Sequence, residues 1–295
     1  MKNSILIIFA LLLSACANKK SETQTNQEII MQANEVVAGI NLTVSEGKRL
    51  IAEGIANHPL VKRKLEKGMI IVTRGTTNTY IAERLAGLSA PHGSFMTGNI
   101  TPEKTGRVNE NLPTVSEIVL IDGKPVEMTY PDALKHLQKD DIVMKGANML
   151  NYERKQAALC IGAPDGGTTG RLRPYVGEGK AKFIIPVGLE KEVFGDLTVY
   201  EKTFSQEVKQ LKYVPKVFVH QNGEIFTEIE ALKVFGDVRV IPFAAGGIAG
   251  REGGTSLAVY GTQEEVQKVL DVVDRIQGEA PFITSAPMPA GTDIP

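Results

Sequence analysis

The chain has 295 residues, a formal net charge of -1 and a sequence pI near 6.5. The chain has no excess of basic residues to bind the phosphates of a nucleic acid, so we expect no nucleic-acid partner. The four histidines are scattered without the spacing of metal ligands, and no segment is a dinucleotide-binding or P-loop motif. We therefore expect no metal and no cofactor.

Residues 1–16 have the pattern of a secretory signal. Lys2 gives a basic start, and residues 5–13 form an apolar run too short to span a bilayer. The run ends in Leu13-Ser14-Ala15-Cys16, which resembles the lipoprotein box of bacteria. That resemblance implies removal of the signal, lipidation of Cys16 and a membrane anchor. The alternative is an ordinary signal whose cleavage site happens to contain a cysteine.

A polar tether is expected over residues 17–27, which contain no apolar residue larger than alanine and cannot bury enough surface to fold. In the lipoproteins that the box resembles, an aspartate after the cysteine retains the protein in the inner membrane. Ala17 stands there instead, so the resemblance implies an extracytoplasmic, lipid-anchored protein of the cell envelope, on the outer membrane if the organism has one. Cys160, the other cysteine, lies in an apolar run and is expected to be buried.

The remaining chain predicts an α/β fold with a mostly parallel open sheet, flanking helices and a smaller C-terminal α+β module. The expected domains are an α/β ligand-binding domain over residues 28–212, a small module over 213–279 and a Pro-rich tail over 280–295. The order of elements in the module resembles a ferredoxin-like unit that lacks one strand we can assign.

Helical periodicity over residues 45–67 predicts two helices, with Ser45 as N-cap and Pro59 at the start of the second. A strand follows over residues 69–73, and a helix is expected from Thr79. The turn between them has the hydroxyls and the helix N-terminus that suit a phosphate or carboxylate. The alternative is a turn whose polar residues only cap the helix. The residues of this turn are Arg74, Gly75, Thr76, Thr77, Asn78 and Thr79.

A long polar loop over residues 89–113 is expected either to cover a site or to lie in solvent. Residues 117–128 alternate around Asp122-Gly123 and predict a β-hairpin. A short helix is expected over residues 131–138.

The central stretch, residues 140–171, provides the remaining site candidates. An apolar run ends in Lys145-Gly146-Ala147-Asn148, and a second, residues 157–161, ends in a glycine loop that begins at Gly162. Strand ends that open into small polar turns form ligand crevices at the carboxyl edge of an open α/β sheet. The candidates here are Lys145, Gly146, Asn148, Asp165, Gly166, Gly167, Thr168 and Arg171.

Further strands are expected over residues 183–187, 217–220, 238–243 and 256–260, with helices over 227–235 and 263–276. The loop over residues 244–254 contains five glycines. It suits either a close approach of backbone to a ligand or a flexible surface hairpin.

The blocks RGTTNT, KGAN and DGGTTGR, in this order, resemble the superfamily of ribose-5-phosphate isomerases, DeoR-type sensors and CoA-transferases over residues 45–187. The resemblance implies a phosphate-binding turn at residues 75–79. Isomerase chemistry does not follow, because Asn148 stands in place of an acidic residue and an amide is no general base. The chain is also similar to an uncharacterised prokaryotic family with the blocks GTTN, KGAN and GGT.

Three functions fit these observations. The first is a membrane-anchored protein that binds a small anionic ligand, phosphorylated or carboxylated and sugar-like. The second is an isomerase- or transferase-like enzyme, in which Asp165 transfers a proton and Lys145 and Arg171 neutralise an anionic intermediate. The third is a structural component of the envelope.

Overall fold

The computed structural model describes residues 31–32, 34–97, 112–206 and 215–282. All helices and strands described below belong to the compact unit that runs from Ala33 to Pro295. Within the described residues the fold is mixed α/β, with eight α-helices and three sheets. The predicted signal, the tether with Cys16, most of the polar loop over 89–113 and most of the predicted tail lie outside these residues.

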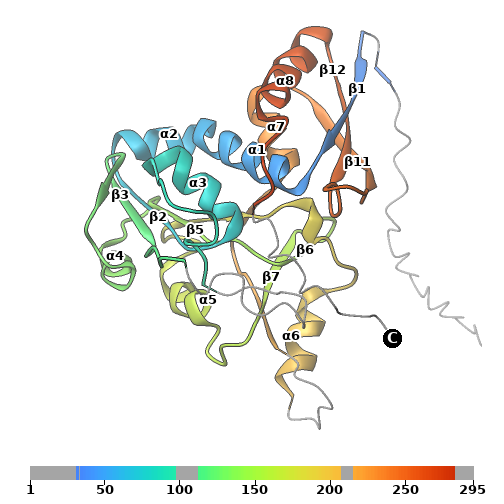
Figure 1. Cartoon of the computed structure of the whole chain (residues 1–295). Coiled ribbons are helices and arrows are strands. Elements are labelled where there is room, and N and C mark those ends of the chain that lie inside the picture. The colour runs from blue at the N-terminus through green and yellow to red at the C-terminus, as the bar shows by residue number, and fades with distance from the viewer. Residues whose placement is uncertain (1–30, 33, 98–111, 207–214, 283–295) are drawn as a thin grey trace, which may run out of the picture. The chain divides into compact units, whose positions relative to one another are not determined.

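The largest sheet has six strands in the order β10-β8-β5-β2-β3-β4 (Figure 1). β10, β8, β5 and β2 are parallel neighbours, and β3 and β4 add the antiparallel hairpin that residues 117–128 predict. Asp122 and Gly123 make its two-residue turn with φ angles of 49° and 74°, which Asp-Gly adopts readily. The strands are β2 (Met69–Val72), β3 (Ile118–Ile121), β4 (Lys124–Val126), β5 (Ile142–Met144), β8 (Lys182–Pro186) and β10 (Glu224–Phe226).

Alternate side chains of this sheet enter two hydrophobic cores, one on each face. Ile70 and Val72 of β2 belong to one core, whereas Met69 and Ile71 belong to the other, as the two-residue period of a strand requires. Burial on both faces explains why these strands are continuous apolar runs in the sequence. Each fully buried Ile or Val side chain stabilises the fold by about 1.5–3 kcal/mol.

Helices cover both faces of the sheet (Figure 1). Leu50, Tyr80 and Leu232 pack in the first core, and Tyr130 and Leu172 pack in the second. The helices of the first face are α1 (Val44–Asn57), α2 (Pro59–Glu66), α3 (Thr76–Ala86) and α7 (Glu228–Phe235), and those of the second are α4 (Tyr130–His136) and α5 (Gly167–Leu172).

Two predicted helix starts were wrong. Thr43, and not Ser45, caps α1, because Thr43 and Glu46 form a reciprocal capping box with bonds of 3.2 and 2.7 Å. Helix α3 begins at Thr76 rather than Thr79, so the predicted polar turn is the first turn of the helix. The break between α1 and α2 at Pro59 is confirmed.

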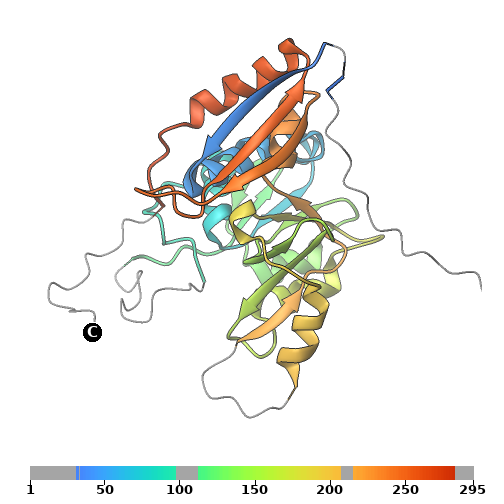
Figure 2. The same cartoon turned by 90° about the vertical axis from the view of Figure 1, so that its right-hand side faces the viewer.

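A second, antiparallel sheet has the order β1-β12-β11. Its first strand comes from residues ahead of the first predicted helix, where the sequence pattern indicated no strand. Helix α8, drawn in red, lies along this sheet (Figure 2). Its Val266, Val269 and Val273 are buried in the first core together with Leu257 and Val259 of β12. The elements are β1 (Val36–Leu42), β11 (Arg239–Ala245), β12 (Thr255–Gly261) and α8 (Gln263–Ile276).

A third sheet has the order β6-β7-β9. β9 and β10 both lie after residue 212, yet they pair with β7 and β8 from before it. The elements are β6 (Met149–Asn151), β7 (Gln156–Ile161) and β9 (Lys216–Val219), with helix α6 (Leu197–Ser205) beside β9 and short 3-10 turns at η1 (Arg173–Tyr175) and η2 (Leu189–Lys191). No described helix is long and apolar enough to cross a bilayer.

Candidate functional site

The strand order reverses between β2 and β5. After β2 the chain continues to β3 on one side of the sheet, and after β5 it next enters the same sheet as β8 on the other side. The crevice outside the carboxyl ends of such a strand pair is where open α/β sheets bind ligands. The first two predicted turns, after Val72 and after Met144, both begin there.

Hydrogen bonds join these two turns directly. Thr73 donates to the carbonyl of Met144 from its backbone N and from its Oγ1, at 3.1 and 2.9 Å. Asn78 Nδ2 donates to the carbonyls of Thr73 and Met144, at 2.7 and 3.3 Å. Lys145 Nζ donates to the carbonyl of Arg74 at 3.4 Å. The two turns therefore form one rim at the carboxyl edge.

The N-terminus of α3 lies in this rim. Its N-cap, Gly75, contributes no side chain, and the backbone N–H groups of Thr76, Thr77 and Asn78 have no partner among the described residues. Thr79 Oγ1 donates to the carbonyl of Gly75 at 2.9 Å, so this hydroxyl stabilises the helix turn. Unpaired N–H groups and the positive end of the helix dipole favour an anion at this end.

Two cations and one carboxylate lie beside the rim. Arg74 Nε is 3.2 Å from Glu117 Oε1, and both side chains are mostly buried. Lys145 is partly buried and has no carboxylate in ion-pair contact among the described residues. The pKa of Lys145 is lowered to about 8, mainly by burial; the charge of Glu117 acts in the opposite direction, and the charge of Arg74 has a smaller lowering effect.

In the third predicted turn, residues 162–170, the acidic residue forms a hydrogen bond within the turn itself. Asp165 is exposed, and its Oδ1 accepts the backbone N–H of Gly167 at 2.9 Å. Gly166 has a φ of 75°, and a Cβ there would lie 2.9 Å from the ring of Phe218. Asp165 therefore closes its own loop.

Tyr130 of α4 contacts the third turn. Its hydroxyl donates to the carbonyl of Thr168 at 3.2 Å. Burial raises the pKa of Tyr130, Glu117 raises it further and the exposed Arg171 lowers it. No described hydrogen bond joins residues 165–171 to either of the other turns.

Asn148 and Gly146 follow β5 but differ in their surroundings. Asn148 Oδ1 accepts the N–H of Cys160 at 2.7 Å, and its Nδ2 donates to the carbonyl of Cys160 at 3.0 Å. Its amide therefore holds β6 and β7 together. The carbonyl of Gly146 instead lies 3.1 Å from Nε2 of His220.

Sequence reasoning missed His220. The pKa of His220 is lowered to about 3, mainly by burial; the bond to Gly146 acts in the opposite direction, and the charges of Lys145 and Arg173 have smaller lowering effects. The ring is therefore neutral, and Nε2 carries the proton donated to Gly146. The Nδ1 atom is buried without a described partner. His220 is 74 positions from Gly146 in the chain, so no local pattern could have indicated the contact.

A second buried charged group also went unpredicted. Lys48 Nζ lies 3.1 Å from Glu190 Oε1, and both side chains are less than a tenth exposed. Glu228 is buried beside them and accepts the N–H of Leu189 at 2.9 Å. Burial, and then the charge of Glu190, raise the pKa of Glu228 well above its usual range.

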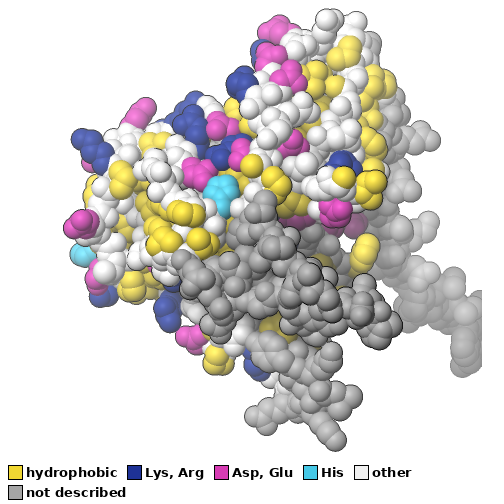
Figure 3. Space-filling model, in the orientation of Figure 1, with side chains coloured by type: hydrophobic (Ala, Val, Ile, Leu, Met, Phe, Trp, Pro, Cys, Tyr) yellow, Lys and Arg dark blue, Asp and Glu magenta, His cyan; other side chains and the backbone are white. Residues whose placement is uncertain are grey.

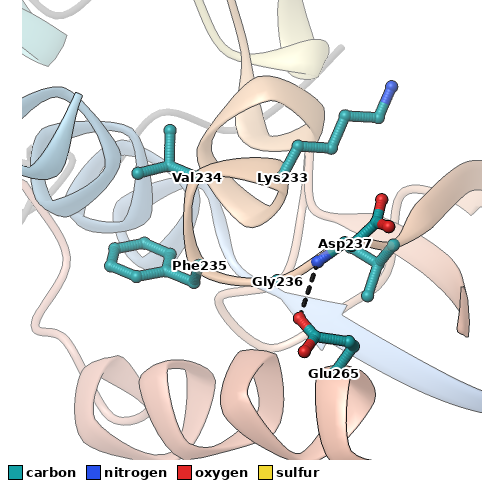
Figure 4. A pocket seen from close by; sticks show the side chains of 7 residues that line it. Lys233, Val234, Phe235, Gly236, Asp237 and Glu265 are labelled. Atoms are coloured by element: carbon teal, nitrogen blue, oxygen red, sulfur yellow. Dashed lines mark hydrogen bonds between the residues drawn. The ribbon is translucent and has the colours of Figure 1, made fainter. Parts of the chain in front are cut away.

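One surface depression lies at the end of α7 and the start of α8 (Figure 4). Its volume is about 570 Å³, and Glu265 Oε2 accepts the N–H of Asp237 at 2.8 Å within it. None of the predicted site residues lines it. It is lined by Lys233, Val234, Phe235, Gly236, Asp237, Val238 and Glu265.

On the face drawn in Figure 3, basic and acidic side chains are interspersed. Among the described residues, no group of three or more His, Cys, Asp or Glu side chains could hold a metal ion. No family model, curated protein or solved structure matches the chain.

Proposed function

We propose that the chain is a membrane-anchored lipoprotein that binds a small anionic ligand, phosphorylated or carboxylated and sugar-like, at the carboxyl ends of β2 and β5. The observation that carries the proposal is Lys145, a partly buried cation without a carboxylate in contact, beside the N-terminus of α3. Removing a charge from water without a counter-charge is costly. An anion in the crevice offsets that cost.

Each part of the rim has a role in this proposal. The N–H groups of Thr76, Thr77 and Asn78 bind the anion, and Lys145 neutralises its charge. Arg74 presents the guanidinium nitrogens that Glu117 does not occupy. The third turn, with Gly166, Gly167, Thr168 and Arg171, bounds the ligand on the side of Tyr130, and Asp165 stabilises that turn rather than transferring a proton.

A substitution at Lys145 tests the binding function. Lys145→Met keeps the length and apolar stem of the side chain but removes the charge. We expect a small anion, identified by mass spectrometry, to co-purify with the full-length chain in mild detergent and to be lost from the variant. The loss of one charged contact corresponds to about 1.5–3 kcal/mol, or at least a tenfold weaker affinity.

Lys182→Met is the matched control. Lys182 lies at the amino end of β8, half exposed and 3.5 Å from Asp140, so its loss leaves the carboxyl edge unchanged. Equal retention of the anion by both variants contradicts a role for Lys145.

The anchor has its own test. We expect Cys16→Ser to abolish incorporation of labelled palmitate and to move the protein from the membrane fraction, because serine provides no thiol for the lipid. Cys160→Ser serves as control, since this thiol lies in β7 and far along the chain from the box. Unchanged labelling of Cys16→Ser would contradict the lipoprotein assignment and its location in the cell envelope.

The finer description of the fold also belongs to this proposal. Four parallel neighbours, β10, β8, β5 and β2, support a mostly parallel open sheet. The antiparallel sheet β1-β12-β11 with α7 and α8 supports a ferredoxin-like module. The relation to the ribose-5-phosphate isomerase superfamily remains a prediction from the three sequence blocks.

A further inference from the structure

The side-chain amide of Asn78 has one orientation only. Its Nδ2 donates to two carbonyl oxygens, those of Thr73 and Met144, at 2.7 and 3.3 Å. Exchanging the two amide atoms would place Oδ1 against both carbonyls, acceptor against acceptor. The orientation is therefore set by the strand ends, and Oδ1 points away from them.

The Oδ1 atom of Asn78 is an acceptor without a donor. The residue is fully buried, and Oδ1 has no hydrogen-bond partner among the described residues. Buried polar atoms are almost always paired, because an unpaired one costs about 1–3 kcal/mol. A donor from outside the described chain is the missing partner.

This acceptor faces the rim of the candidate site. A Cβ at Gly146 would lie 4.0 Å from Asn78 Oδ1 and 3.3 Å from the carbonyl oxygen of Pro186, and it would meet no other atom outside residues 145–147 within 4 Å. The space above Gly146 is therefore bounded by two acceptor oxygens. Asn78 is the third residue of α3, so this acceptor belongs to the same helix turn as the unpaired N–H groups of Thr76, Thr77 and Asn78.

A ligand bound here must accept hydrogen bonds from the protein and also donate one to it. The N–H groups and Lys145 require negative oxygen atoms, whereas Asn78 Oδ1 requires a hydrogen-bond donor. Sulfate, phosphodiesters and ionised carboxylates present acceptors only, so one of their oxygens would face Oδ1 unpaired. Free phosphate keeps one proton on an oxygen at neutral pH and satisfies both requirements. A phosphate monoester is mostly a dianion at this pH, so its donor must be a hydroxyl elsewhere in the ligand.

We propose that Asn78 makes this site selective for an anionic ligand that brings its own hydrogen-bond donor, of which free phosphate is the simplest example, over sulfate, which brings none. This inference rests on the proposed anion-binding function and restricts it to one chemical class. Asn78 is the specificity-determining residue.

Titration calorimetry with inorganic phosphate and with sulfate tests the selectivity. The full-length chain is kept in mild detergent at neutral pH and constant ionic strength. We expect phosphate to bind at least about tenfold more tightly than sulfate, since an unpaired buried acceptor costs that much or more. Equal affinities would overturn the inference and leave anion binding intact, with a buried water as the partner of Oδ1. Binding of neither anion would overturn the proposed function as well.

The variant Asn78→Ala tests the residue itself. Removing Oδ1 removes the unfavourable contact with sulfate, so we expect the affinities for phosphate and sulfate to converge. Asn57→Ala is the control, because Asn57 Nδ2 only donates to the carbonyl of Glu53 within α1, and it should keep the wild-type ratio. Full selectivity in folded Asn78→Ala would contradict the assignment. If that variant does not fold, the ratio measured on the wild-type chain still decides.

Discussion

The partly buried Lys145 and the fully buried Glu228 have pKa values displaced in the direction of their neutral forms. Burial lowers the pKa of Lys145 to about 8, and burial with the charge of Glu190 raises the pKa of Glu228. Both effects have the same cause, because a low dielectric disfavours the charged form of any group. They differ in their surroundings. Lys145 lies in the rim beside unpaired N–H groups, whereas Glu228 lies beside Lys48, Glu190 and Leu189.

The raised pKa of Glu228 predicts a dependence of stability on pH. The folded protein holds the Glu228 proton at pH values where the unfolded chain, with a pKa near 4.5, has released it. The contribution of protonated Glu228 to the free energy of unfolding is therefore fully present below about pH 4.5 and is lost as pH rises through the raised folded pKa. Glu228→Gln has no proton to lose, so we expect its stability relative to wild type to increase between pH 5 and pH 9 by about 1–3 kcal/mol.

Urea unfolding at the two pH values measures this difference. Comparing variant with wild type at each pH cancels the contributions of all other titrating groups. Glu264→Gln is the control, because the Glu264 side chain is four-fifths exposed and its partner is Lys268 rather than a histidine, so its difference from wild type should be the same at both values. A pH-independent difference for Glu228→Gln would show that burial and the charge of Glu190 do not raise the pKa of Glu228.

Among the elements, the contact between α1 and α7 depends on a glycine. A Cβ on Gly54 would lie 2.6 Å from the Cα and the Cβ of Ala231, so only glycine lets the two helix backbones approach this closely. Helix α7 follows β10 of the large sheet, and α1 follows β1 of the antiparallel sheet. This one contact therefore helps to hold two sheets together.

We expect Gly54→Ala to lower the free energy of unfolding by about 1–3 kcal/mol, because the added methyl group forces the helices apart. The intrinsic helix propensity of alanine acts in the opposite direction but is smaller, about 1 kcal/mol. Gly39→Ala on β1 is the matched control, since a Cβ there meets nothing within 4 Å. Chemical denaturation of both variants measures the effect, and equal stabilities would show that the helices relax without cost.

At the scale of the whole molecule, strands from the last part of the chain pair with strands from its earlier parts. β1 pairs along its full length with β12, with Val36 opposite Gly261 and Leu42 opposite Thr255. β9 joins the third sheet by pairing with β7, and β10 joins the largest sheet by pairing with β8. The strands after residue 212 therefore have their partners in three earlier parts of the chain.

This arrangement predicts that residues 215–282 do not fold alone. Without β1, β7 and β8, all three partner edges are open, and β12 loses one of its two neighbours. We expect this fragment to show no cooperative unfolding transition by circular dichroism, in contrast to the full-length chain. A cooperative transition would support the independent module expected from the sequence at residues 213–279.

The sequence by itself determined the features that depend on neighbouring residues. Continuous apolar runs indicated β2 and β5, Asp122-Gly123 indicated the hairpin, Pro59 indicated the helix break, and the apolar period of residues 263–276 indicated α8. Each follows from local conformational preference or from the burial of one or both faces of the element, and both are visible within a few residues.

Only the tertiary structure decided which polar groups meet. The sequence showed the polar residues after β2 and β5, but not that Asn78 bridges the two strand ends, that His220 reaches Gly146, or that β1 completes the sheet of β11 and β12. It also could not show that Asp165 and Asn148 bind their own loops and strands. The physical reason is that hydrogen bonds and strand pairs join atoms that are close in space, and packing brings them together from distant parts of the chain.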